Sequence, residues 1–410
     1  MLSLFRRIAA PLLYLASAAF AAADPTPLAN AIACALFDAG TQVATHVPAS
    51  GAVEVFDAFC DLSGQPKIYS YNEEAAFALA HGASLGGARS AAILKSHGFA
   101  KAANAVVDSI VAGNSAALVL LVFHDATGAH SDTILDTLPL VAGTGIRHLS
   151  PEPDAAYSEI LRAFLLSEKF QIPVAVVVDS ADLSSPVALD RRPLPPLPPA
   201  PFLRDAHRRV LCPFLAPYQR RALEARLAEL PPPPDKPSLP KVPDDLPPKF
   251  KPTALAYQPV FDAFLQIKGD DAVVAGDAGT SALFAFPPYS CIDVVSYYGG
   301  SIPLAAGLAL AGRSNAWAVC GDFAFVAAAH MGLPEAVQRN LPVKTIVFHN
   351  RVAAATGGQP LQPDVFELVL GGYRDFVRRV RSDADPADIL RALDVARKSP
   401  RPEIVVVDVP

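Results

Sequence analysis

The chain has 410 residues, 51% of them hydrophobic, and a formal net charge of −6 at neutral pH. This length predicts two or three domains, and the composition allows large buried cores. An acidic balance without a long basic run argues against nucleic acid as a partner. The five cysteines are scattered and form no C-x-x-C pair, so the sequence predicts neither a zinc site nor an iron–sulfur cluster in this chain.

The first 24 residues differ in kind from the rest. Arg6 and Arg7 precede an apolar run, 8–23, that ends in A-A-A-D. A basic start, a short apolar stretch and an Ala-x-Ala end are typical of a secretory signal. An N-terminal helix of the first domain or a wrongly assigned start codon would explain the same letters. The run is too short and too rich in alanine to predict a membrane span.

Residues 25–185 alternate between helical and strand patterns. A helix is predicted at 28–39, and strands are predicted near 42–47, 91–94, 117–123 and 173–178. The strands are almost continuously apolar, as is typical of parallel strands covered on both faces. The alternation therefore predicts a parallel sheet wrapped by helices.

Residues 186–252 have a different composition. About half of the chain's 40 prolines fall in this segment. Such a stretch favours extended polyproline geometry over helix or sheet. One helix, near 217–230, is predicted to interrupt it. We interpret the segment as a long linker between two domains.

Residues 253–410 resume the alternation. Strands are predicted near 272–275, 293–296, 317–320, 343–348 and 404–407. Two α/β domains of similar size suggest a duplicated architecture, although no sequence identity is visible between the halves. The expected fold class is α/β, with two mostly parallel sheets flanked by helices and joined by the proline-rich linker.

Polar residues follow the predicted strands of the first domain. Glu73 opens a helix after a short strand, where the helix dipole stabilises a carboxylate even if it has only a capping role. His97 lies in the loop KSHGFAKAAN, and His124 and His130 lie in the loop FHDATGAHSDT. Polar loops after apolar strands commonly carry catalytic groups, although each histidine could equally be a surface residue.

The second domain has two glycine clusters and one acidic corner. GDAGT at 276–280 and YGGSI at 298–302 each follow a strand, and the second opens a helix, which suits phosphate binding. Gly321-Asp322 and Asn350 stand at the exits of two strands with a helix between them. At the carboxyl edge of a parallel sheet, these oxygen ligands suit Mg²⁺. A helix cap at Asp322 and a loop turn at Asn350 are the alternative.

Taken together, these motifs resemble the thiamine-diphosphate enzymes. GD-x(27)-N resembles their Mg²⁺–diphosphate motif, and HNRVAAATGGQP resembles the matching segment of 2-oxoacid:ferredoxin oxidoreductases. GDAGTSALFAFPP and YGGSIPLAAG look most like the indolepyruvate oxidoreductase α subunit. NEEAAFALAHGASLGGARS and KSHGFAKAAN resemble its pyrimidine-binding domain and the phosphonopyruvate and sulfopyruvate decarboxylases. The resemblance covers nearly all of the chain except 1–24 and the linker.

The resemblance implies a pyrimidine-binding domain at 25–185 and a diphosphate-binding domain at 253–410, with thiamine diphosphate and Mg²⁺ as cofactors. It implies that Glu73 hydrogen-bonds N1′ of the aminopyrimidine, because its nine-residue offset to Gly82 fits the family better than that of Glu74. The implied Mg²⁺ ligands are Asp322, Asn350 and the carbonyl oxygen of Val352. The other implied cofactor-binding residues are Gly276, Asp277, Gly299, Gly300, Ser301, Gly321 and Phe323, the last replacing a usually small residue.

The expected activity is decarboxylation of a small 2-oxo acid, with two outcomes open. An oxidoreductase component would need a separate electron-transfer subunit, because the Cys-rich domain of the α subunit is absent from the sequence. A non-oxidative decarboxylase would need a proton donor, for which His97, His124 and His130 are candidates. A catalytically idle thiamine-fold interaction protein is a third possibility. We expect a homodimer and, from the family, a cytoplasmic location, with export as the alternative.

Overall fold

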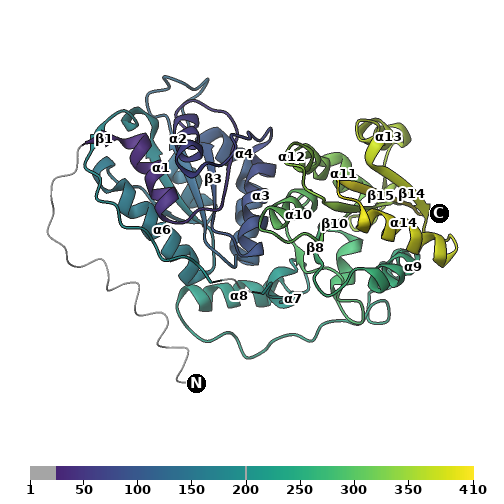
Figure 1. Cartoon of the computed structure of the whole chain (residues 1–410). Coiled ribbons are helices and arrows are strands. Elements are labelled where there is room, and N and C mark those ends of the chain that lie inside the picture. Colours follow the sequence, from purple (N-terminus) through teal and green to yellow (C-terminus); the bar gives the residue numbers. More distant parts are fainter. Residues whose placement is uncertain (1–24, 199–200) are drawn as a thin grey trace.

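The computed structural model describes residues 25–198 and 201–410, and the predicted signal at 1–24 lies outside them. The chain forms two lobes, each a parallel sheet covered by helices on both faces, with the linker running beneath them (Figure 1). This arrangement confirms the predicted fold class. Among the described residues, no helix is both long and apolar enough to span a membrane.

The first domain is built on a five-stranded parallel sheet with the strand order β2-β3-β4-β6-β5. Its strands are β2 Val43–His46, β3 Ser90–Lys95, β4 Leu118–His124, β5 Arg147–Leu149 and β6 Val174–Asp179. Its helices are α1 Leu28–Asp38, α2 Val53–Ser63, α3 Glu73–Gly86, α4 Ser96–Ala112, α5 Thr137–Gly143 and α6 Ala156–Phe170. α1, α2 and α6 cover one face of the sheet, and α3 and α4 cover the other.

The second domain has a six-stranded parallel sheet with the order β14-β15-β11-β10-β8-β9. Its strands are β8 Val273–Gly276, β9 Val294–Val295, β10 Ala316–Gly321, β11 Lys344–His349, β14 Val377–Arg381 and β15 Glu403–Asp408; β12 Val352–Ala353 and β13 Gln359–Pro360 form a separate ribbon. Its helices are α9 Lys251–Ile267, α10 Ser301–Leu310, α11 Asp322–Ala327, α12 Gly332–Gln338, α13 Pro363–Gly371 and α14 Pro386–Lys398. α9 and α14 cover one face, and α10 to α13 cover the other.

The two sheets share one topology. When β9 is set aside, the order β8-β10-β11-β15-β14 repeats β2-β3-β4-β6-β5 in chain order. In this correspondence α3 and α10 are equivalent, since each precedes the second strand of the shared set. The predicted duplication of architecture therefore holds at the level of strand order.

The equivalent helices α3 and α10 pack directly on each other and join the two domains. A Cβ added at Gly82 would lie 2.1 Å from the carbonyl oxygen of Leu304, and one at Gly307 would lie 2.0 Å from that of Leu79. Only glycine permits backbones to approach this closely. One apolar core runs through both domains along this contact.

The linker is ordered by short elements at both ends. β7 Pro186–Val187 pairs with β1 Thr26–Pro27 of the first domain. α7 Ala206–Arg209 and α8 Ala216–Leu227 follow, and Val210 bridges to Val295 at the edge of the second sheet. α8 matches the helix predicted near 217–230, whereas α7 was not predicted. The linker therefore pairs with a strand of each domain: β1 of the first and β9 of the second.

Candidate active site

The two acidic-corner residues lie at the carboxyl ends of neighbouring strands. β10 and β11 are parallel, with Gly321 opposite Phe348. Asp322 Oδ2 accepts the amide N–H of Arg351 at 2.7 Å, and Asn350 Oδ1 accepts that of Val352 at 3.2 Å. Because the two side-chain oxygens rest on consecutive amides, they are held close together. The structure thus brings together the residues that the spacing singled out.

The loop after β11 is held in a strained conformation. Arg351 has a φ of 62°, in the left-handed region that a residue with a side chain rarely adopts. Such strain persists where surrounding contacts impose it, and it concentrates at functional sites. Here it directs the Arg351 amide to Asp322, whose side chain is buried. Burial raises the pKa of Asp322, so a bound cation would favour its charged form.

The amide of Asn350 is oriented by a residue that the sequence did not reveal. Asn350 Nδ2 donates to the hydroxyl of Tyr257 at 2.9 Å, while Oδ1 accepts the amide N–H of Val352, a group that can only donate and so fixes which end of the amide is oxygen. Tyr257 belongs to α9 and stacks on Phe348 with 3.9 Å between the ring centroids. These contacts leave Asn350 Oδ1 as the atom expected to face a metal ion.

The donor set suits a hard cation. The expected set comprises one carboxylate at Asp322, one carboxamide oxygen at Asn350 and the carbonyl of Val352, which in the structure accepts the amide N–H of Ala354 at 3.0 Å. Across the described ranges, no group of three or more His, Cys, Asp or Glu residues could hold a metal ion. One carboxylate with neutral oxygens is typical of Mg²⁺ that shares its shell with phosphate oxygens. A Cβ added at Gly321 or Gly279 would meet nothing within 4 Å, so both glycines border open space.

The glycine turn before α10 is organised by Asp277. Its carboxylate accepts the Gly299 amide and the Ser301 hydroxyl, each at 2.7 Å. Burial raises its pKa to about 6, opposed by these hydrogen bonds. Gly299 has a φ of 89°, and a Cβ at Gly300 would lie 2.6 Å from the Tyr297 ring. The Gly299 amide and the Ser301 hydroxyl, which were expected to bind a phosphate, thus donate their hydrogen bonds to Asp277.

Three further residues near this edge of the sheet have different surroundings and therefore different roles. A Cβ at Gly276 would lie 2.9 Å from Ile292, so this glycine serves the packing of the sheet. Phe323 is half-buried, and its amide donates to Asp322 Oδ1 at 2.8 Å. Thr280 Oγ1 is buried and has no hydrogen-bond partner among the described residues. The Thr280 hydroxyl, which was not among the predicted site residues, is therefore a further candidate for contact with a phosphate.

Glu73 lies at the first position of α3. The side chain of Asn72 caps the helix by accepting the amide of Ala75 at 3.0 Å. Glu73 forms an ion pair with Lys101 at 2.8 Å. A Cβ at Gly98 would lie 2.9 Å from Glu73 Cγ, so this glycine leaves room for the carboxylate.

Glu74 forms its hydrogen bond with a different side chain from those that contact Glu73. Its Oε1 accepts Asn104 Nδ2 at 3.2 Å, and burial raises its pKa. The two adjacent glutamates thus have separate environments, which is consistent with separate roles.

The predicted histidines lie around one loop of the first domain. His97 and His124 were both predicted to lie in loops, but the former is the second residue of α4 and the latter is the last residue of β4, the strand that neighbours β3. His97 contacts Thr133 Oγ1 at 2.9 Å, and His124 contacts Thr137 Oγ1 at 2.8 Å. His130 is exposed, and its carbonyl accepts a hydrogen bond from Lys95. Of the three histidines, His97 is the one next in sequence to Gly98, the residue packed against Glu73.

Contacts between the domains bring the two halves of the site together. The hydroxyl of Tyr297 donates to the carbonyl of Glu74 at 3.4 Å, which places the N-termini of α3 and α10 side by side. The buried carboxylate of Glu335 on α12 accepts Ser70 Oγ at 3.1 Å and Arg339 Nη1 at 2.5 Å. These bonds fix the segment that leads into Glu73 against the second domain.

Two family models match this chain. Residues 277–406 match the thiamine pyrophosphate enzyme, C-terminal TPP binding domain. Residues 47–189 match the pyruvate flavodoxin/ferredoxin oxidoreductase, thiamine diP-binding family. The chain is a thiamine pyrophosphate enzyme. The matches fall on the second and first domains respectively, so the glycine turn and the acidic corner lie in the cofactor-binding part of the family.

Relatives of this thiamine pyrophosphate enzyme are distant. It is 29% identical over 190 residues to the indolepyruvate oxidoreductase subunit IorA of Methanothermobacter thermautotrophicus, a match covering 42% of this chain and 30% of the relative. It is 27% identical over 159 residues to the sulfopyruvate decarboxylase subunit alpha of Methanococcus maripaludis, covering 37% and 93%. The match thus spans less than a third of the indolepyruvate relative.

Solved structures share the fold along the chain. The Rhodococcus jostii RHA1 thiamine diphosphate-dependent 4-hydroxybenzoylformate decarboxylase aligns with a TM-score of 0.62 and 16% identity, covering 94% of this chain and 99% of that one. The benzoylformate decarboxylase of Polynucleobacter necessarius aligns with a TM-score of 0.61 and 12% identity, covering 94% and 98%. At such identities the likeness establishes the fold alone.

Proposed function

We propose that this chain binds thiamine diphosphate with Mg²⁺ and decarboxylates a small 2-oxo acid. The observation that carries the proposal is the oxygen corner at Asp322 and Asn350, set in a matched cofactor-binding domain beside the helix that begins with Glu73. The corner supplies hard ligands, and Glu73 supplies the carboxylate that such a cofactor needs. When bound, thiamine diphosphate provides the electron sink for decarboxylation.

In this proposal the second domain holds the diphosphate end. Asp322, Asn350 and the carbonyl of Val352 ligate Mg²⁺, which anchors the diphosphate. Open space beside Gly321 and Gly279 leaves room for it, and Thr280 Oγ1 can donate to a phosphate oxygen. Asp277 keeps the Gly299–Ser301 turn in shape. Tyr257 keeps Asn350 Oδ1 directed to the metal.

The first domain would hold the pyrimidine end. Glu73 accepts the hydrogen bond of N1′ and holds or moves its proton. The close contact with Gly98 and the ion pair with Lys101 position the carboxylate. The side-by-side helix N-termini support a cofactor that bridges the two domains of one chain. We also propose that the chain forms a homodimer in the cytoplasm. In a homodimer, a cofactor site between domains of two subunits is the alternative to a site within one chain.

Two outcomes of decarboxylation have separate support. The match of the first domain to an oxidoreductase family and the indolepyruvate relative favour an oxidative reaction with a separate electron-transfer subunit. The sulfopyruvate relative, matched over 93% of its length, favours non-oxidative decarboxylation. In the latter, His97 is our preferred proton donor over His124, because it adjoins Gly98 and thereby the Glu73 side chain. The sequence motifs leave the substrate open.

Product analysis with and without an artificial electron acceptor tests these proposals. The purified protein, loaded with thiamine diphosphate and Mg²⁺, would be given aryl and small aliphatic 2-oxo acids. Aldehyde release without acceptor would support the non-oxidative reaction and eliminate the oxidative one, whereas acceptor-dependent CO₂ release would do the reverse. Glu73→Gln is the inactive control. Cofactor binding without turnover of any substrate would instead favour an idle interaction protein.

A further inference from the structure

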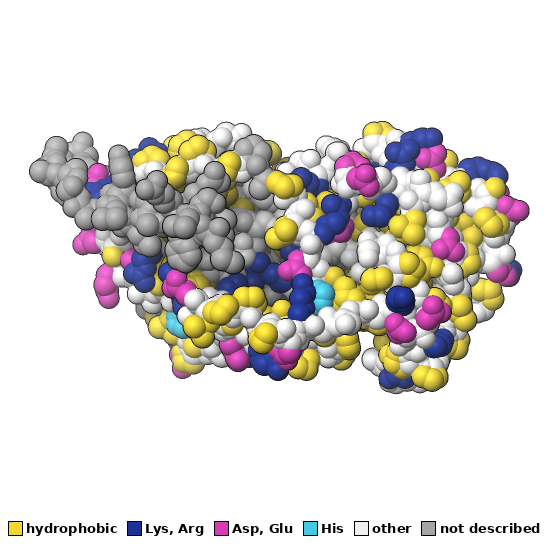
Figure 2. Space-filling view, turned by 90° about the horizontal axis from the view of Figure 1, so that it is seen from below, with side chains coloured by type: hydrophobic (Ala, Val, Ile, Leu, Met, Phe, Trp, Pro, Cys, Tyr) yellow, Lys and Arg dark blue, Asp and Glu magenta, His cyan; other side chains and the backbone are white. Residues whose placement is uncertain are grey.

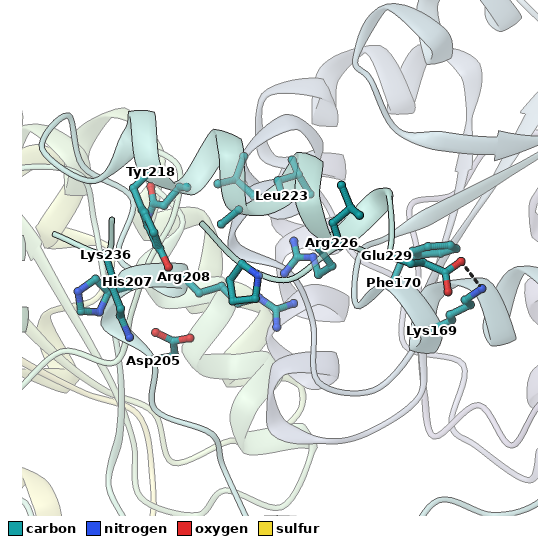
Figure 3. A pocket seen from close by; sticks show the side chains of 15 residues that line it. Lys169, Phe170, Asp205, His207, Arg208, Tyr218, Leu223, Arg226, Glu229 and Lys236 are labelled. Atoms are coloured by element: carbon teal, nitrogen blue, oxygen red, sulfur yellow. Dashed lines mark hydrogen bonds and ion pairs between the residues drawn. The ribbon is translucent and has the colours of Figure 1, made fainter. Parts of the chain in front are cut away.

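A second feature lies far from the thiamine site, where the linker crosses the first domain. A cavity of about 710 Å³ opens between α7, α8 and the ends of α4 and α6 (Figure 3). Four cationic and two acidic side chains line it, together with His207, although the whole chain carries a net charge of −6. Figure 2 shows Lys and Arg side chains gathered in the hollowed middle of this face. The cavity is therefore locally cationic in an acidic protein.

Within the described ranges, two arginines of the cavity form no salt bridge with an acidic side chain. Arg208 donates from Nη1 to Gln171 Oε1 at 2.5 Å and from Nη2 to its carbonyl at 2.9 Å. Arg226 donates from Nη2 to the carbonyl of Ile110 at 3.4 Å. The Nε atoms of both arginines are buried and have no hydrogen-bond partner among the described residues. In the described part of the chain, the hydrogen-bond acceptors of these two guanidinium groups are thus neutral oxygens.

The two guanidinium groups also repel each other. In Figure 3 they lie close together between α7 and α8. Burial lowers the pKa of Arg208 to about 9, and the next cause is the charge of Arg226. Arg209, 1% exposed, adds a third positive charge. Among the described residues, Asp205 is the acidic group that acts on Arg208, and its effect on that pKa is smaller than the effect of either neighbouring arginine. At Arg209, Asp205 and Asp293 both oppose the loss of charge. Burying like charges is costly, and within the described part of the chain the Arg208–Arg226 pair is only partly compensated.

The remaining charges at the cavity rim do not neutralise the pair. Lys169 and Glu229 pair with each other at 2.6 Å, as the dashed line in Figure 3 marks. Lys236 adds another cation, and His207 contacts the carbonyl of Pro237 at 2.8 Å. The described part of the chain therefore leaves the positive charge of the cavity only partly compensated.

We propose that this cavity binds a small organic anion whose phosphate or carboxylate group lies between Arg208 and Arg226. Guanidinium groups recognise such planar or tetrahedral oxyanions through charge-assisted hydrogen bonds. Phe170 and Leu223 line the same cavity and can contact an apolar or ring-shaped body of the ligand. The site is separate from the thiamine site and holds whether or not the proposed reaction is correct.

Thermal unfolding of the full chain with model anions tests the site. Phenyl phosphate and benzoate carry the two headgroups on the same ring, and NaCl at equal ionic strength is the salt control. At about a hundredfold excess over Kd, we expect the preferred anion to raise Tm by about 5 °C above the salt control. The stronger of the two responses identifies the headgroup.

Two arginine variants of α8 test whether the anion that raises Tm binds at Arg226. Arg226→Met keeps an unbranched apolar stem in place of the arginine stem but removes the guanidinium group, and we expect it to weaken anion binding by at least about tenfold. Without anion it should unfold at the same or a higher temperature than the wild type, because a repulsion is removed. Arg220→Met on the same helix, where Arg220 is exposed and paired with Glu224, should retain the full response.

Three results would overturn the proposal. One is that neither anion raises Tm beyond the salt control. Another is that Arg226→Met responds like the wild type, which would place the anion elsewhere. The third is that Arg226→Met is less stable than the wild type without anion and equally responsive per bound ligand, as a purely structural arginine would be.

Discussion

The contact between α3 and α10 yields a prediction with a magnitude. In Gly82→Ala the new Cβ would lie 2.1 Å from the carbonyl oxygen of Leu304, whereas ordinary contacts begin near 3.4 Å. The helices must therefore separate by about 1.3 Å at this point, the difference between the two distances. The new Cβ is bonded directly to the helix backbone and the Leu304 oxygen is itself a backbone atom, so no side-chain rotation can relieve the contact.

The energetic cost follows from two opposing effects. Overpacking of a well-packed core costs about 1–3 kcal/mol, and rigid backbone on both sides puts this site at the upper end. The higher helix propensity of alanine stabilises the folded state by about 1 kcal/mol and partly offsets this loss. We therefore expect a net loss of about 2 kcal/mol in the free energy of unfolding, which corresponds to a fall in Tm of about 5 °C.

Urea unfolding and cofactor titration measure the two consequences separately. Gly143→Ala is the matched control, because a Cβ at the end of α5 would meet nothing within 4 Å. The control should be as stable as the wild type or slightly more stable. Gly82→Ala should also bind thiamine diphosphate more weakly, since α3 begins with Glu73. A Gly82→Ala protein as stable as Gly143→Ala would refute the close helix contact.

Three further substitutions test single atoms of the site. Tyr257→Phe keeps the stack on Phe348 but frees the Asn350 amide, so Mg²⁺-dependent cofactor affinity should fall about tenfold; an unchanged Kd by calorimetry would contradict this. Thr280→Val removes an unsatisfied buried hydroxyl, so the cofactor-free protein should lose no stability while cofactor affinity falls; loss of stability with full affinity would contradict this. Burial raises the pKa of Asp277 from its ordinary value of 3.8 to about 6 in the folded state, so between these pH values the folded state binds the extra proton. Wild type should therefore lose up to about 3 kcal/mol relative to Asp277→Asn as pH rises from about 4 to about 6, and a constant difference in urea midpoints would contradict this.

Much of the fold was predictable because its central strands are nearly pure apolar runs. β4 and β6 lie within one residue of the predicted spans. The missed strands are edge strands. β14 reads VRRVR and β5 reads RHL, and their pairing depends on neighbouring strands and not on their own side chains. α7, with four residues, is too short to show a helical period.

The acidic corner was predictable because strand exits in a parallel sheet converge on one edge. Asp322 and Asn350 required only the spacing of two strands and a helix. Tyr257 precedes Asn350 by 93 positions, and no local pattern links them. The orientation of Asp277 toward Gly299 depends on how β8 and β9 pair, which the sequence does not state. Long-range partners of this kind come only from the folded chain.

Titration of the cofactor-free protein with thiamine diphosphate and Mg²⁺, followed by native mass spectrometry and calorimetry, tests the central claim most directly. We predict one cofactor with one Mg²⁺ per chain. In folded Asp322→Ala, affinity should fall by more than about a hundredfold, since loss of a direct ligand exceeds the effect of its supporting residues. Absence of binding to the wild type, or equal binding to Asp322→Ala, would contradict the account.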